Sequence, residues 1–68
     1  MTVHRYRVVV AGHLGKALLQ AFEGLEIKHE GNNTALIGDL DQAALHGVLN
    51  RANSLGLDLI EAVRLPES

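Results

Sequence analysis

Polar and hydrophobic residues alternate along four short stretches of this chain, and a period of two is typical of β-strands. The four stretches cover residues 4–11, 25–30, 34–40 and 57–65. The first becomes wholly apolar from residue 8 onward, so we expect a central strand that is more buried toward its end.

Two further stretches repeat their apolar residues every three or four positions, which is the period of an amphipathic helix. The first covers residues 16–23, and Gly24 is placed to end it in a left-handed conformation. The second begins after an N-cap, for which Asp39 and Asp41 are both candidates, and it ends before Gly56.

Three local signals refine the connections between these elements. Residues 31–33 read Gly-Asn-Asn, which predicts a hairpin turn between the second and third strands. Gly38 lies inside the third strand, where a glycine indicates a bulge or a close approach of another part of the chain. Glu61 interrupts the apolar positions of the last strand, so a bulge there would change which face its side chains occupy.

The predicted order is strand-helix-strand-strand-helix-strand within one domain that spans residues 1–68. Right-handed crossovers place both helices on the same face of the sheet. An α+β ferredoxin-like plait satisfies this order, with a four-stranded antiparallel sheet in the spatial order 4-1-3-2 and two helices on one face.

Alternation divides the strand residues between a face covered by the helices and an open face. The covered set comprises Tyr6, Val8, Val10, Leu25, Ile27, Leu36 and Leu40. The open set joins charged residues to three aliphatic ones and comprises Arg5, Arg7, Val9, Glu26, Lys28, Glu30, Ala35, Ile37 and Asp39. The last strand adds to the open face either the set Asp58, Ile60, Ala62 and Arg64 or the residues that alternate with them.

An aliphatic centre inside a charged rim resembles a protein–protein interface more than a solvated sheet. We therefore expect the chain to bind itself, as a homodimer or a larger homo-oligomer, or to dock onto another protein. The expected interface residues are Arg5, Arg7, Val9, Ile37, Ile60 and Ala62. Pairing along the edge of the second or the last strand is the other route to a dimer. The competing interpretation is that scattered surface aliphatic residues are ordinary on any domain.

The composition is that of a small folded domain, and the net charge argues against some classes of binding partner. The chain has 68 residues, of which 47% are hydrophobic and 21% are charged, and its formal net charge is −2. That charge offers no general attraction to nucleic acid or to an anionic membrane, and the apolar runs are too short to cross a bilayer. Since the amino end leads into a strand pattern without a signal peptide, we expect a cytoplasmic protein.

Catalysis and metal binding are not expected from the residue types present. The chain has no cysteine, and neither Ser54 nor Ser68 lies beside a histidine or in a nucleophile-elbow sequence. A transition metal requires three or four converging ligands. The predicted elements carry the four histidines to different parts of the fold: His4, His13, His29 and His46. We therefore predict no enzyme activity, no metal site and no cofactor.

The first glycine turn is the one candidate ligand site in the sequence. Its residues are Gly12, His13, Gly15 and Lys16, between a strand and a helix. Backbone N–H groups and a helix start there would favour a phosphate or the carboxylate of an amino acid. The glycine spacing matches neither a P-loop nor a dinucleotide fingerprint, so the alternative is a turn that needs glycine for its backbone angles.

The segment L-D-Q-A-A-L-H-G-V-L-N-R at residues 40–51 resembles one that is common in short uncharacterised bacterial α/β proteins. The likeness continues through residues 55–60 and includes Y-R-V-V-V at residues 6–10, so it covers most of the chain. It implies an unassigned family and carries no activity across.

The chain also resembles the ACT domain, a regulatory module of the same strand and helix order. The resemblance lies in Gly15 at the helix start and in the apolar residues that follow it, Leu18, Ala21, Phe22, Leu25 and Ile27. It implies that copies of the domain pair, and that an amino acid binds where they meet. A small-molecule sensor and an accessory subunit of a separately encoded enzyme are the alternatives to a protein-interaction module.

Overall fold

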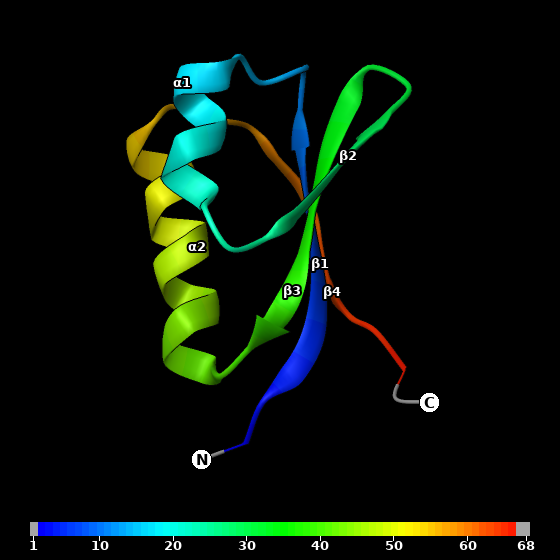
Figure 1. Cartoon of the computed structure of the whole chain (residues 1–68), viewed down its shortest axis with the longest axis vertical. Coiled ribbons are helices and arrows are strands. Elements are labelled where there is room, and N and C mark those ends of the chain that lie inside the picture. Colours follow the sequence, from blue (N-terminus) through cyan, green and yellow to red (C-terminus); the bar gives the residue numbers. More distant parts are fainter. Residues whose placement is uncertain (1, 67–68) are drawn as a thin grey trace.

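The computed structural model describes residues 2–66, so Met1, Glu67 and Ser68 lie outside the described range. Within that range the chain forms four strands and two helices (Figure 1). In chain order these are β1 (His4–Ala11), α1 (Lys16–Leu19) with a 3₁₀ turn η1 (Gln20–Phe22), β2 (Glu26–Glu30), β3 (Asn33–Leu40), α2 (Gln42–Ser54) and β4 (Leu59–Arg64).

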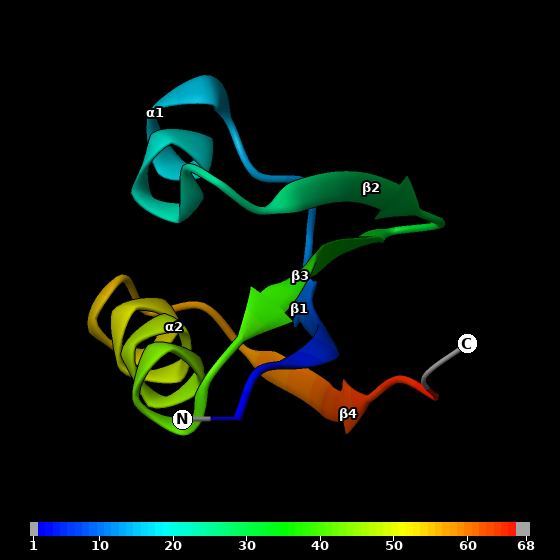
Figure 2. The same ribbon diagram turned by 60° about the horizontal axis from the view of Figure 1, so that its bottom comes forward.

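The four strands form one antiparallel sheet in the order β2-β3-β1-β4. Both helices lie on the same side of this sheet (Figure 2). The predicted α+β class, antiparallel sheet and two helices are therefore confirmed. None of the helices within residues 2–66 is long and apolar enough to span a bilayer.

The main hydrophobic core lies between the sheet and the helices. Its buried members come from β1, β3, both helical segments and the loop before α1, and are Val8, Val10, Leu14, Phe22, Leu36, Val48 and Ala52. Leu25, Ile27 and Leu40 pack against them, as alternation predicted for the covered face.

The first helix is shorter than the predicted span of residues 16–23, because its second half tightens into the 3₁₀ turn η1. Gly24 then adopts a φ of 94°, the left-handed conformation that was predicted for it. This stop lets the chain enter the edge strand β2 two residues later.

The second helix has the caps that the sequence indicates at both ends. Asp41, rather than Asp39, is the N-cap, and its Oδ1 accepts a hydrogen bond from the Ala44 N–H at 2.7 Å. At the other end Gly56 has a φ of 73°. The N–H groups of Gly56 and Leu57 donate to the carbonyls of Asn53 and Ala52, which is the pattern of a Schellman motif.

The last strand contains the predicted bulge, and it decides between the two alternatives for the faces of β4. The register pairs Val9 with Glu61 but Val10 with Leu59, so it shifts between these two pairs. Beyond the bulge Ala62 lies opposite Val8, a residue of the core beneath the helices. Placing Ala62 on the open face was therefore wrong, since the bulge reverses the phase that a regular strand would have.

Candidate functional site

The open face of the sheet has a small apolar cluster of its own. Val9, Ala35 and Ile37 form it, Leu65 packs against it, and neither Ile60 nor Ala62 belongs to it. The exposed fractions are 3% for Val9 and 7% for Ile37, although no helix covers this face. The aliphatic centre that was expected to attract a partner is therefore buried within the chain itself.

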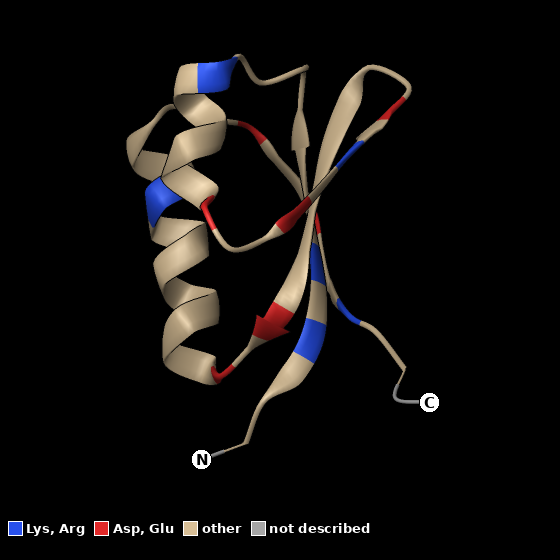
Figure 3. Cartoon of the chain, viewed as in Figure 1, with Lys and Arg blue, Asp and Glu red and all other residues tan. Residues whose placement is uncertain are grey.

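Charged side chains from all four strands surround this cluster and pair with one another. Arg5 lies 3.6 Å from Glu26 and 3.5 Å from Asp39. Arg7 pairs with Glu30 and, at 3.9 Å, with Glu61. Charged residues along β1, β2 and the end of β3 are visible in Figure 3.

This network changes what the open face can do. Each arginine joins carboxylates of two different strands, and Lys28 adds a further contact to Glu26 at 3.6 Å. Exposed ion pairs contribute little individually, roughly 0 to 1 kcal/mol each. Their long side chains nevertheless present a charged outer layer over Val9 and Ile37, so the centre of the open face offers paired charges instead of apolar area.

Exposed apolar area is concentrated on β4 instead. Leu59 and Ile60 are each 51% exposed and Val63 is 41% exposed. β4 is an edge strand, paired with β1 on one side only. Leu59 and Val63 project from opposite faces of β4, since they pair with Val10 and Arg7. The outer edge of β4 carries the backbone groups that can pair with another strand.

The other edge of the sheet has the opposite character. β2 reads Glu-Ile-Lys-His-Glu, and only Ile27 of the five is not exposed. Charged side chains on an edge strand oppose pairing with further strands. The two edges thus differ in a way that favours association at β4.

Ile60 is one of the expected interface residues, whereas Leu59 and Val63 belong to the alternating set that was the open alternative for the last strand. The charge of Glu61, which predicted the bulge, also gives the face of Val63. Glu61 pairs with Arg7 and therefore lies on the open face of the sheet. Val63 follows two residues later in the strand, so its side chain lies on the same face.

The first glycine turn is held to the β2–β3 hairpin by hydrogen bonds. The Thr34 hydroxyl donates to the Gly12 carbonyl at 2.7 Å, and His13 Nε2 donates to the Gly31 carbonyl at 2.6 Å. Gly12 has a φ of 87°, which explains the glycine there. Gly15 precedes α1 with an ordinary φ of −71°.

Lys16 is not brought together with the other residues of that turn. Its side chain lines an open hollow of about 410 Å³ with Leu19, Gln20 and Glu23. The Gly12 carbonyl and the His13 ring are used within the fold, where they hold this turn to the β2–β3 hairpin.

Two of the histidines meet, contrary to the sequence-based expectation. The ring centroids of His13 and His29 lie 4.9 Å apart. The antiparallel pairing of β1 with β3 sets Ala11 opposite Asn33, so the loop after β1 lies beside the hairpin that follows His29. No group of three or more metal-ligating side chains occurs among residues 2–66.

Comparison with known proteins identifies one family. A family model described as a domain of unknown function (DUF8691) matches residues 5–63. No curated protein and no solved structure matches the chain.

Proposed function

Since this chain belongs to the DUF8691 family of domains, which carries no assigned activity, we propose a function from its surface. The domain is a non-catalytic interaction or regulatory module that associates with a second copy of itself through the edge strand β4 (Leu59–Arg64). The single observation that carries this proposal is the exposure of Leu59, Ile60 and Val63 on an edge strand.

The fold that supports this proposal is the ferredoxin-like plait. Read from β4, the sheet order is 4-1-3-2, and both helices lie on one side of the sheet. In this arrangement two copies that meet along β4 form one continuous eight-stranded sheet with every helix on the same side.

The estimated free energy of association requires contributions from both buried side chains and backbone hydrogen bonds. Burying the remaining exposed half of a Leu, Ile or Val side chain contributes roughly 1 kcal/mol. Three such residues from each copy give roughly 6 kcal/mol, which is close to the lower estimates for the entropic cost of association. The additional hydrogen bonds of a β-ladder are therefore needed for a dimer that forms at micromolar concentration.

The charges on β4 select one register for the pairing. Centring the ladder on Glu61 would set two like charges directly opposite each other, which is unfavourable. Centring it on Ala62 sets Glu61 opposite Val63 of the other copy and Ile60 opposite Arg64. Glu61 and Val63 both lie on the open face, so this opposed pair points to the same side of the sheet, and the smallest side chain lies on the twofold axis.

Sedimentation velocity across about 1 to 100 μM tests the proposal, because this range brackets a micromolar dissociation constant. We expect a dimer that becomes a monomer in Ile60→Lys, since the added charge cannot be buried between two apolar edges. Leu55→Lys is the matched control, because Leu55 is 41% exposed like Val63 but caps α2 away from the sheet edge. A wild-type monomer throughout this range would overturn the proposal.

The open face of the sheet is the competing interface. Its contact residues would be Arg5, Arg7, Val9 and Ile37. In that case Ile60→Lys would leave the dimer intact and Arg7→Glu would abolish it. Binding of an amino acid or a phosphate at Gly12 to Lys16, and a role as an enzyme's accessory subunit, stay predictions for the same domain.

A further inference from the structure

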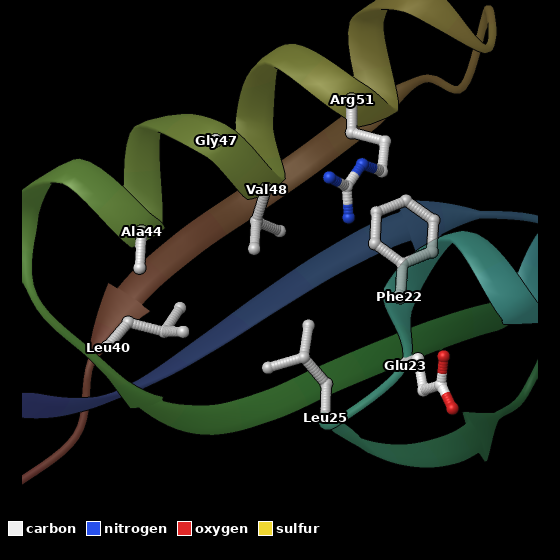
Figure 4. Close-up of a pocket in the computed structure, with 8 residues that line it drawn as sticks. All are labelled: Phe22, Glu23, Leu25, Leu40, Ala44, Gly47, Val48 and Arg51. Carbon is white, nitrogen blue, oxygen red and sulfur yellow. The ribbon is translucent and has the colours of Figure 1, made fainter.

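A cavity of about 280 Å³ lies between the two helical segments, on the covered side of the sheet (Figure 4). It exists because α1 is only one turn long and the segment α1–η1 stands apart from α2, as Figure 2 shows. Apolar side chains from three elements line it, and among them Phe22 and Val48 also belong to the main core.

Gly47 forms one wall of this cavity, and nothing in the fold requires a glycine there. It lies inside α2 and has no positive φ. A Cβ added to it would meet nothing within 4 Å. Because glycine in a helix interior is less favourable than alanine, the packing of the chain alone would favour a side chain at this position. The absence of one keeps the cavity open.

A guanidinium group lies at the end of the cavity. Arg51 Nη1 donates a hydrogen bond to the Ala21 carbonyl at 2.6 Å, and this bond ties α2 to η1. The guanidinium lies beside the ring of Phe22 (Figure 4). An arginine has five N–H donors in a planar fork, so the donors left by this one bond can hold a carboxylate.

We propose that this cavity binds a small molecule with a carboxylate and a short branched apolar tail. Arg51 holds the carboxylate, and the tail packs on Leu25, Leu40 and Val48. The volume lies just below the usual range for ligand sites, which limits the ligand to a few heavy atoms beyond its carboxylate. This site is separate from the β4 edge and does not depend on self-association.

Glu23 distinguishes two kinds of ligand, an α-amino acid and a simple carboxylic acid. Glu23 lines the same cavity as Arg51. An α-amino acid would place its ammonium toward Glu23, whereas a simple carboxylic acid would leave Glu23 in water. The experiment below therefore includes one ligand of each kind.

Two-dimensional NMR titration of the full chain with 4-methylpentanoate and with L-leucine tests the proposal. 3-Methylbutylamine serves as the ligand without a carboxylate. We expect saturable shifts of the backbone amides around Gly47 and Arg51 with at least one carboxylate and none with the amine. Tighter binding of L-leucine that is lost in Glu23→Gln would identify an amino acid, and equal binding of the two would identify the carboxylic acid.

Two substitutions separate binding from folding. Arg51→Gln removes the charged partner of the carboxylate, so binding weakens roughly tenfold or more. Gly47→Leu fills the cavity and abolishes binding, while the melting temperature does not fall, because a Cβ at this position meets nothing within 4 Å and leucine favours a helix over glycine. The absence of saturable shifts with both carboxylates, equal binding of the amine, or unchanged binding by Gly47→Leu would each overturn the proposal.

Discussion

The side chain of Leu25 packs directly over Gly38. A Cβ built on Gly38 would lie 2.5 Å from Leu25 Cδ2, closer than real side chains approach. Leu25 leads into the edge strand β2 and Gly38 lies in β3, so this contact fixes how the end of η1 meets the sheet. Gly38 has no positive φ, so the glycine here relates to space and not to backbone angles, and the atom that a Cβ would displace is a terminal methyl of Leu25.

Gly38→Ala should therefore destabilise the fold. Leu25 has to move away from the core, which costs about 1 kcal/mol or more by analogy with other overpacked sites. Urea unfolding measures the change. Gly47→Ala is a control of opposite sign, because its Cβ meets open space and alanine favours the helix by about 0.5 to 1 kcal/mol. Equal effects of the two substitutions would contradict this account of Gly38.

Asp41→Ala should cost about 1 kcal/mol of stability, because it removes the side chain that caps α2. Asp39→Ala should change stability by less than about 0.5 kcal/mol, since Asp39 makes only an exposed ion pair with Arg5. Thermal unfolding of both variants at neutral pH gives the comparison. A larger loss in Asp39→Ala would show that the cap is assigned to the wrong residue.

Arg7→Glu should weaken the fold without changing the oligomeric state. The new carboxylate would face Glu30 and Glu61 over the buried Val9, a cost of about 1 kcal/mol that shrinks as salt screens the charges. Unfolding at low and high salt measures the stability, and sedimentation measures the association. Loss of the dimer in Arg7→Glu would favour the open face as the interface.

Gly12→Ala should destabilise the chain by about 1 kcal/mol, because Gly12 has a φ of 87° that alanine adopts with strain. Lys16→Ala, four residues later, should lie within about 0.5 kcal/mol of the wild type. Melting curves with and without inorganic phosphate check both expectations. A rise with phosphate that Lys16→Ala removes would identify the turn as a ligand site.

Local chemistry explains why much of the fold could be predicted from the sequence. Gly24 and Gly56 end helices because few other residues adopt a positive φ, and a glycine inside a strand signals a close neighbour. The bulge near Glu61 was predicted because a charge interrupted an apolar pattern. These signals depend on residues close together in the chain.

Features that depend on side-chain packing between distant segments could not be predicted in the same way. The burial of Val9 and Ile37 depends on arginines of β1 reaching carboxylates of β2, β3 and β4. The contact of His13 with His29 depends on where a loop folds relative to a hairpin. The cavity beside Gly47 depends on the spacing between two helical segments that no periodicity specifies.

The most direct test of self-association through β4 is oxidation of the variant Ala62→Cys. The chain has no cysteine of its own, so any disulfide must join two copies. Residues directly opposite in an antiparallel ladder have Cα atoms about 4.5 to 5.5 Å apart, a separation that a disulfide spans. We predict rapid and nearly complete conversion to a covalent dimer, with little conversion of Ala43→Cys, an exposed alanine on α2. Ala62→Cys that dimerises no faster than Ala43→Cys would contradict the account.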